Sequence, residues 1–409
     1  MTDLRLLFAH NITQARESIG ISQAEAARRL ETDRQRLIGM EKGERPIDAQ
    51  MLVRFAEVYN VAIAQLLGTI GTAKKPELLE PRFRGQPKLE SERTAITKFQ
   101  AFCSNYAKLL EKTGDTTKPF KSFELDVAGS SRARRYAVEA AAAELRKLWD
   151  IGDVAPIGQD IFHLLTENGV TVYKTLIQEE GSVLAGASLK HPVIGSVILV
   201  NVRDTPQRQV FTAAHELGHL LYHFDNAESN DIFISNKLER NADEDLANDF
   251  ASAFLMPSSG IKRHLMRLGV TAEEVQVKHV ISLQRYFNVS YLAMLYRLKK
   301  LQIVKGNSHF AELEQVRPVV EARGLGYELA EWEFSYEPKL NRPDGLPMDF
   351  VAHVLLAEKN GLISTNQAAK YLEMTSEQYN AFLILYNQHL VKRDDQRNTD
   401  RDDAIAINA

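Results

Sequence analysis

Two histidines four residues apart in the stretch FTAAHELGHLLYH, residues 211–223, constrain this chain more than any other feature. Residues 207–222 are expected to be helical, and side chains at positions i and i+4 of a helix lie on one face, about 6 Å apart. His215 and His219 can therefore direct their imidazole nitrogens at one ion. Imidazole nitrogen is a common ligand of Zn²⁺, so the spacing predicts a zinc site on this helix.

Glu216 follows the first histidine and is expected to lie beside the ion without binding it. Its carboxylate can accept a proton from water that the metal activates and pass that proton to the leaving amine of a peptide bond. The sequence therefore predicts Glu216 as the catalytic base of metal-assisted peptide hydrolysis.

A zinc site of this kind needs a third protein ligand. Histidines at 215, 219 and 223 would extend over about 12 Å of helix axis, too far to share one ion. His223 is therefore expected to support a ligand, to face the substrate or to cap the helix end. Glu244 precedes the apolar face of a helix expected over residues 237–255 and is the predicted ligand, with Asp243 and Asp245 as rivals on the same turn.

Runs of β-branched residues at 170–173 and 193–200 predict strands of a small sheet. The second run comes shortly before the histidine-containing helix. We expect this strand to pair with an extended substrate, which would add to the sheet as a further strand.

Residues 22–46 have the pattern of two short helices joined by a three-residue turn. Ser22 and Asp33 are typical N-caps, and an inner apolar face is formed by Ala26, Ala27, Leu30, Leu37 and Met40. The start of the second helix is then exposed. Arg34, Gln35 and Arg36 are candidates to reach the base edges of double-stranded DNA, and Gln23 is a candidate to contact a phosphate.

Charge does not by itself indicate DNA binding, because residues 1–68 contain nine basic and nine acidic residues. Affinity would have to come from where the charges are placed. Residues 69–98 contain seven Lys or Arg and four Glu, and this surplus of three can add salt-sensitive phosphate contacts. The alternative is a helical protein-binding module whose arginines are only solvated.

A length of 409 residues predicts two or three domains. We expect an all-α helix-turn-helix domain at 1–68, a basic linker and connecting helix at 69–130, an α+β zincin-like metallopeptidase domain at 131–304, a helical accessory region at 305–391 and a disordered tail at 392–409. Within the accessory region, residues 368–375 allow two interpretations. One is a second helix-turn-helix, and the favoured one is a helical pair for partner binding or dimer contact.

Composition is that of an ordinary folded protein, with 44% hydrophobic and 25% charged residues. A single cysteine, Cys103, excludes an intrachain disulfide and indicates a reducing compartment. The first twenty residues lack an apolar signal region, and no run of eighteen apolar residues occurs anywhere. These features predict a cytoplasmic protein without membrane contact.

The N-terminal pattern resembles the helix-turn-helix of the XRE and phage-repressor family. The matching residues are Ser22, Gln23, Ala27, Leu30, Leu37, Glu41 and Gly43, followed by Leu52, Ala56, Val61 and Leu66. Glu31 stands where such domains often have a turn glycine. We therefore expect Glu31 to adopt a left-handed conformation, at a cost on the order of 1 kcal/mol.

Residues 156–301 resemble the ImmA/IrrE family of zinc-dependent endopeptidases. The matching motifs are AHELGHLLYH at 214–223, the pattern E-x-x-A-N-x-F-A starting at Glu244, the tripeptide LMP at 255–257 and FNVSYLAMLYRLKKL at 287–301. The resemblance implies a gluzincin-like site with His215, His219 and Glu244 as zinc ligands and Glu216 as the catalytic residue. It also implies cleavage of a repressor or membership of a toxin–antitoxin module.

Two functions are consistent with these features. The first is a DNA-binding transcriptional regulator whose zinc endopeptidase domain cleaves a protein, such as a repressor or antitoxin partner. The alternative is an antitoxin-like repressor whose peptidase-fold domain grips a partner without needing proteolysis. A homodimer is expected in either case, because helix-turn-helix proteins commonly bind two DNA half-sites.

Overall fold

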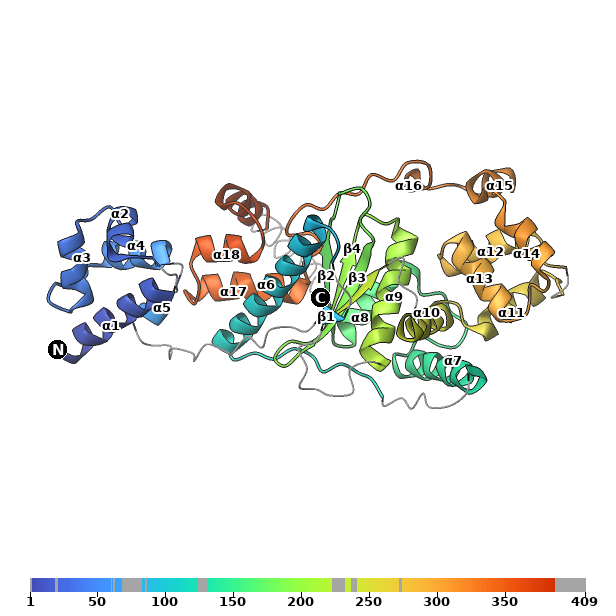
Figure 1. Cartoon of the computed structure of the whole chain (residues 1–409), viewed down its shortest axis with the longest axis horizontal. Helices are drawn as coiled ribbons and strands as arrows, with labels where there is room; N and C mark the ends of the chain where they lie inside the picture. Colours follow the sequence, from blue (N-terminus) through green and yellow to red (C-terminus); the bar gives the residue numbers. More distant parts are fainter. Residues whose placement is uncertain are drawn as a thin grey trace, which may run out of the picture. The chain divides into compact units, whose positions relative to one another are not determined.

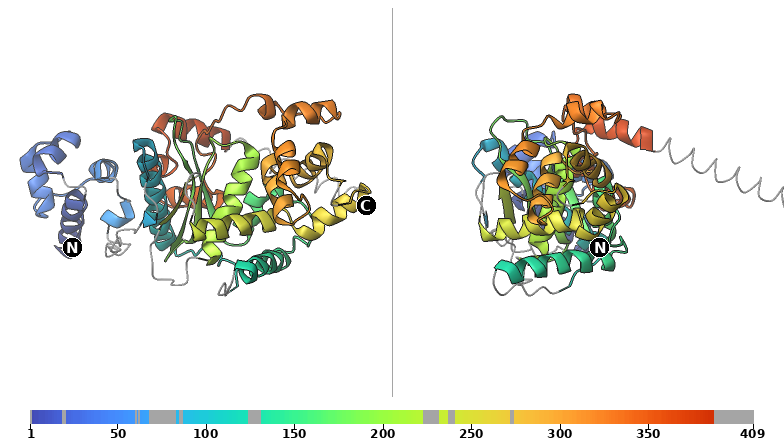
Figure 2. Two further views of the ribbon diagram at one scale, coloured as in Figure 1. Left: turned by 45° about the vertical axis from the view of Figure 1, so that its right-hand side comes forward. Right: turned by 90° about the vertical axis from the view of Figure 1, so that its right-hand side faces the viewer.

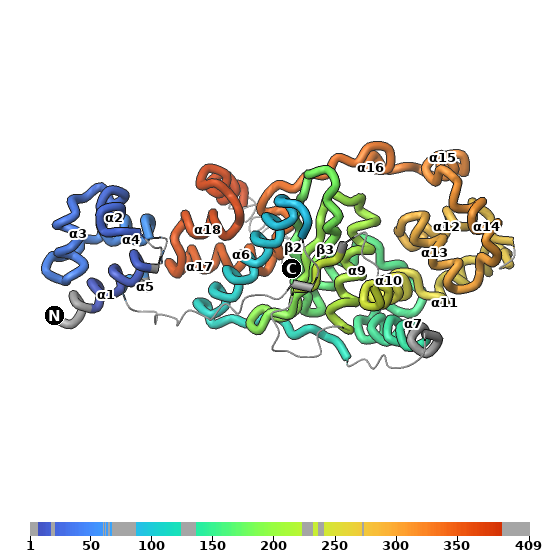
Figure 3. Tube along the Cα trace, in the orientation of Figure 1, coloured from blue at the N-terminus to red at the C-terminus, as the bar shows by residue number. Residues whose placement is uncertain are grey.

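A computed structural model of the chain describes ten segments of it, shown in Figures 1 and 3. They are residues 2–18, 21–59, 61, 63–67, 83–84, 87–123, 131–222, 232–236, 241–271 and 274–386. These segments fall into two compact units, the first within 1–76, 108–115 and 342–409, and the second within 77–107 and 116–341. In these segments no helix combines the length and apolar character needed to cross a bilayer.

The first unit begins with five helices: α1 (Thr2–Ser18), α2 (Gln23–Arg29), α3 (Arg34–Glu41), α4 (Ala49–Tyr59) and α5 (Ile63–Leu66). The predicted caps are confirmed, since Ser22 Oγ accepts from Glu25 N at 3.2 Å and Asp33 Oδ1 accepts from Arg36 N at 2.7 Å. The predicted inner face, formed by Ala26, Ala27, Leu30, Leu37 and Met40, is buried. It belongs to one core with Ile12 of α1 and Phe55 and Tyr59 of α4.

Four residues rather than the predicted three separate α2 from α3. Glu31 lies in this turn with φ of +54°, which confirms the predicted left-handed conformation. A side chain at such a φ is strained, and a glycine would relieve the strain.

The second unit is built around a five-stranded mixed sheet in the order β1-β5-β3-β4-β2. The strands are β1 (Phe83–Arg84), β2 (Val170–Thr175), β3 (Leu184–His191), β4 (Gly195–Asn201) and β5 (Ile232–Asn236). β3 runs antiparallel to β4 and β5, whereas β2 pairs parallel with β4 and β1 pairs parallel with β5.

The expectation that the strand at 193–200 pairs with substrate is wrong. This strand is β4, and it is hydrogen-bonded to β3 on one side and to β2 on the other. Both of its edges are used by the protein, so no further strand can add there. Pairing order in a sheet is a tertiary property that β-branched composition does not reveal.

Helices cover both faces of the sheet, and Figure 2 shows α6 (Glu90–Thr113) and α9 (Pro206–Tyr222) on opposite sides. The Phe99 and Phe102 rings of α6 lie 5.7 and 4.9 Å from the ring of Tyr173 on β2. α9 packs on β3 and β4 across the other face, and α10 (Ala242–Leu255) and α7 (Ser131–Leu148) follow behind it. β4 is apolar on both faces because both are covered.

Two charged side chains of the second unit are buried and bonded to backbone. The Arg146 guanidinium donates to the carbonyl oxygens of Gly152, Ala155 and Phe254, which fixes α7 against α10. The Glu92 carboxylate accepts from the amide nitrogens of four residues, Lys88, Leu89, Val183 and Leu184, and from the Ser182 hydroxyl. Glu92 thereby joins the start of α6 to the start of β3.

The remaining helices complete both units. The second unit adds η1 (Gly158–Asp160), α8 (Ile161–Glu167), α11 (Ser258–Arg267), α12 (Val277–Phe287), α13 (Tyr291–Lys300), α14 (Asn307–Glu314), α15 (Pro318–Gly324) and α16 (Glu331–Phe334). The first unit adds α17 (Met348–Lys359), α18 (Thr365–Tyr371) and a helix over residues 376–386. α10 begins later than the predicted start at 237. The predicted fold class, a helix-turn-helix domain followed by an α+β domain and further helices, is confirmed.

Candidate functional site

Helix α9 carries both histidines on the face that meets α10. His215 and His219 are 6% and 1% exposed, and their Nε2 atoms lie 3.0 Å apart. Gly218 allows the two helices to approach, because a Cβ added there would lie 3.1 Å from Ala247 Cα on α10. The small residue between the histidines therefore sets how near α10 can come.

Helix α10 brings Glu244 to the two histidines. Its first turn is fixed by Asn241, whose side chain accepts from the amide nitrogens of Asp243 and Glu244. Glu244 Oε2 lies 3.1 Å from His215 Nε2, and Glu244 Oε1 lies 3.2 Å from His219 Nε2. The rivals Asp243 and Asp245 are exposed, whereas Glu244 is buried.

The donor set fits a zinc ion. The ligand atoms of His215, His219 and Glu244 all lie within 4.8 Å of one another. Two ligands at 2.0–2.1 Å from a tetrahedral ion are separated by about 3.3 Å, close to the distances between these atoms. Two imidazoles and one carboxylate also form a ligand set of catalytic zinc sites, in which a fourth position stays open.

Electrostatics keep Glu244 ionised. Burial acts to raise the pKa of Glu244, but hydrogen bonds with His215 and His219 and their positive charges hold it at about 2. For His215, burial acts to lower the pKa, and the Glu244 hydrogen bond together with the charges of Glu216 and Glu244 raises it above its usual value. The ionised Glu244 carboxylate suits metal binding, and its negative charge is one reason why the pKa of His215 is raised.

Glu216 lies against the sheet, next to Gly186 of β3. Its side chain is fully buried, and in the described part of the chain neither carboxylate oxygen has a hydrogen bond of good geometry. It lies over Gly186 of β3, where an added Cβ would be 2.6 Å from Glu216 Oε1. Burial raises the pKa of Glu216 to about 7, while the charge of His215 and the Ser235 and Ser188 hydroxyls act to lower it. A carboxylate whose pKa lies near neutral pH is suited to accept and release a proton.

Sequence reasoning assigned no role to two further residues around the triad. The amide oxygen of Asn248, one turn after Glu244, lies 3.0 Å from His215 Nδ1. A proton on Nδ1 donated to this oxygen leaves Nε2 free to bind a metal. Phe233 of β5 stacks on the His219 ring, with centroids 5.7 Å apart. The i+4 spacing from Glu244 to Asn248 is a signal that could have found the first of these.

The remaining candidate near the metal centre, His223, lies outside the described residues. Its three predicted roles stay predictions.

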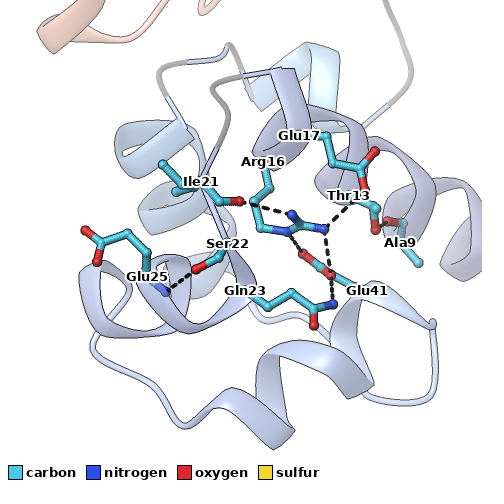
Figure 4. A network of polar contacts seen from close by, with 9 residues as sticks. All are labelled: Ala9, Thr13, Arg16, Glu17, Ile21, Ser22, Gln23, Glu25 and Glu41. Atoms are coloured by element: carbon cyan, nitrogen blue, oxygen red, sulfur yellow. Dashed lines mark hydrogen bonds and ion pairs between the residues drawn. The ribbon is translucent and has the colours of Figure 1, made fainter.

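The DNA-reading candidates lie at the start of α3. Arg34, Gln35 and Arg36 are all exposed there, directly after the Asp33 cap. Gln23 is placed differently: its amide nitrogen donates to Glu41 Oε2 at 2.7 Å, and Arg16 donates to the same carboxylate (Figure 4). One of the two amide hydrogens of Gln23 is therefore used inside the domain, and a phosphate contact would use the other.

Two family models match the parts of the chain that contain the candidate sites. Residues 12–66 match the family model of a helix-turn-helix, and residues 166–299 match that of the IrrE N-terminal-like domain, a peptidase family. The second match includes α9 and α10 with the complete His-His-Glu triad. The chain thus carries a helix-turn-helix domain followed by a domain similar to the IrrE N-terminal-like domain.

Two curated proteins are similar to part of this chain. The radiation response metalloprotease IrrE of Deinococcus radiodurans is 35% identical over 106 residues, which cover 25% of this chain and 30% of that protein. The protein of the same name from Deinococcus deserti is 31% identical over 167 residues, which cover 40% of this chain and 54% of that protein. The chain therefore spans about a third and about half of the length of these two relatives.

Proposed function

We propose that this chain is a DNA-binding transcriptional regulator that hydrolyses a protein substrate at a zinc-dependent endopeptidase site. The observation that carries the proposal is the convergence of His215, His219 and Glu244 beside a buried carboxylate, Glu216. The match to an IrrE-like peptidase domain and the exposed basic start of α3 support it.

In this proposal three residues bind the metal and one acts as the general base. His215, His219 and Glu244 would hold Zn²⁺, which supplies Lewis acidity toward water and the peptide carbonyl when bound. Asn248 orients the His215 ring through Nδ1. Glu216 takes up a proton of the attacking water as the C–O bond forms, and then delivers it to the leaving amine as the peptide C–N bond breaks.

Metal binding is tested first. We expect the wild type to contain one equivalent of zinc by elemental analysis, His219→Ala to contain little, and Glu216→Gln to retain it. Equal zinc in the wild type and in His219→Ala would contradict the ligand assignment.

Proteolysis is then tested without knowing the substrate. A lysate of the host cell is incubated with wild type or with Glu216→Gln, and new N-terminal peptides are identified by mass spectrometry. We expect one or a few cleavage sites with the wild type and none with the variant. If Glu216→Gln still represses transcription and neutralises its partner, proteolysis is not needed for function, and the alternative of an antitoxin-like repressor is favoured.

The DNA-binding half of the proposal rests on Arg34, Gln35 and Arg36, with a homodimer as the expected form on two half-sites. Arg34→Ala is expected to weaken binding to a selected operator by about 5- to 150-fold. Light scattering of the full chain with and without operator DNA measures the oligomeric state.

A further inference from the structure

The C-terminal part of the first unit repeats a segment of the N-terminal helix-turn-helix. Residues 363–373, ISTNQAAKYLE, align without gaps to residues 21–31, ISQAEAARRLE, at a constant offset of 342. Six of the eleven positions are identical: Ile, Ser, Ala, Ala, Leu and Glu. A second helix-turn-helix is one of the two interpretations of residues 368–375, and the repeat favours it over a helical pair for partner binding.

The two segments have the same secondary structure at the same offset. α2 covers Gln23–Arg29 and α18 covers Thr365–Tyr371, and the helices after them begin at 34 and at 376. Ser364 Oγ accepts from Gln367 N at 3.2 Å, as Ser22 does from Glu25 N. Each repeat therefore begins its first helix with the same cap.

The turns also correspond. Glu373 has φ of +57°, and Glu31 has φ of +54°. The backbone amides of residues 372, 373 and 374 donate to the carbonyls of 368, 370 and 369, and those of 30, 31 and 32 donate to the carbonyls of 26, 28 and 27. Thr375 caps the following helix by accepting from Gln378 N, as Asp33 does from Arg36 N. A glutamate in a strained conformation at both places is hard to explain by chance.

The repeated apolar positions form the core of a small helical unit. Ala368, Ala369, Leu372 and Tyr379 are buried, as are Ala26, Ala27, Leu30 and Leu37 at the matching positions. The Tyr379 hydroxyl donates to Glu358 on α17, which joins the helix over 376–386 to α17. The unit formed by residues 348–386 thus exposes the start of its last helix, the position from which a helix-turn-helix reads DNA.

The exposed side chains at that position are of base-reading types. Ser376, Glu377, Gln378 and Asn380 are exposed, at or beside the positions matching Arg34, Gln35 and Arg36. Hydroxyl, carboxylate and amide groups can all bond to base edges in the major groove. Residues 348–386, however, contain two Lys, one Asp and three Glu, so this unit has little attraction for phosphates.

We propose that residues 348–386 are a second helix-turn-helix that reads base edges on DNA already held by the N-terminal domain. The inference rests on the proposed DNA binding of that domain, which provides the phosphate contacts. Tethering on one chain replaces the affinity that the second motif lacks, because it raises the effective concentration of the motif at the DNA. The second motif then contributes sequence discrimination without salt dependence.

The test is selection of binding sites from a random duplex DNA library by the full-length chain. The wild type is compared with Glu377→Ala/Asn380→Ala, with Arg34→Ala/Arg36→Ala, and with Lys359→Ala, an exposed residue at the end of α17 outside the proposed base-reading positions, as the matched control. All substituted side chains are exposed, and circular dichroism verifies that each variant keeps its helix content.

We expect the wild type and Lys359→Ala to enrich a composite site with two sequence elements, and Glu377→Ala/Asn380→Ala to enrich only one. Affinity for the composite site should fall about tenfold in this variant, with the same slope of affinity against salt. Arg34→Ala/Arg36→Ala should lower both the affinity and the salt slope. Enrichment of the same sequences by wild type and Glu377→Ala/Asn380→Ala overturns this inference alone and leaves the motif as a protein contact or a structural element. Enrichment of no sequence by any form overturns the DNA-binding proposal as well.

Discussion

Replacing Gly186 by alanine places a methyl group where the base carboxylate lies. The added Cβ would be 2.6 Å from Glu216 Oε1, 2.8 Å from Thr212 Cγ2 and 2.9 Å from the Leu199 carbonyl oxygen. The Glu216 side chain can rotate away, but the Leu199 oxygen belongs to the backbone of β4 and can move only with the strand. Overpacking of this kind costs about 1–3 kcal/mol, and the backbone contact favours the upper part of that range.

Two measurements separate the effect on stability from that on catalysis. Urea unfolding of Gly186→Ala should show a lower midpoint with an unchanged slope, equivalent to about 2–3 kcal/mol. Zinc content should stay that of the wild type, since the ligands lie on α9 and α10. Hydrolysis of the identified substrate should fall about 100-fold, because displacement of a catalytic group by about 1 Å has effects of that size.

Gly324→Ala is the matched control. Nothing lies within 4 Å of an added Cβ at Gly324, and this residue ends a helix, α15. Its stability should stay the same or rise by up to about 1 kcal/mol. If Gly186→Ala unfolds at the wild-type urea concentration and cleaves at the wild-type rate, the account of how Glu216 is placed is wrong.

Four further predictions follow from buried groups. Arg146→Leu leaves three backbone carbonyls without their donor and should lower the free energy of unfolding by about 3 kcal/mol in urea titrations. Burial acts to raise the pKa of Glu92, but hydrogen bonds from backbone amides and Ser182 lower it below its usual value. The ionised carboxylate therefore stabilises the folded state above about pH 4.3, and this contribution is lost as the pH falls through the lower folded-state pKa. Glu92→Gln should therefore be less stable than wild type at pH 7, and the difference should shrink in unfolding experiments toward pH 3. A chelator should lower the melting temperature of the wild type but not that of His219→Ala, because only the former gains stability from bound metal. Burial raises the pKa of the Cys103 thiol, so a thiol reagent should label it only after denaturant is added, and fast labelling of the native protein would contradict its burial.

Local signals in the sequence predicted much of the helical structure and the three residues that the fold brings together as a candidate metal site. The i, i+4 spacing put His215 and His219 on one helix face, and the apolar period of α10 favoured Glu244 over its exposed neighbours. The caps at Ser22 and Asp33 located the helix-turn-helix. The left-handed conformation of Glu31 could be predicted because Glu31 stands where related domains often have a turn glycine. Each of these is a property of a few consecutive residues.

Properties that depend on distant contacts could not be predicted. β3, with the sequence LAGASLKH, contains small residues of low β propensity because Gly186 and Ser188 must leave space for Glu216 on α9. The composition of this strand therefore did not predict it, and β5 was not predicted either. The role of β4 was misjudged because strand order decides which edges are open, and no local pattern encodes strand order.

The pairing of β1 with β5 has a consequence for how a polypeptide can approach the metal centre. Phe233, which stacks on the His219 ring, is the residue of β5 whose backbone pairs with Arg84. Arg84 belongs to the segment that joins the helix-turn-helix to the peptidase domain. A polypeptide that binds as a strand along this edge of β5 would have to displace β1 from its backbone hydrogen bonds. The segment between the two domains therefore competes with any incoming strand for this edge.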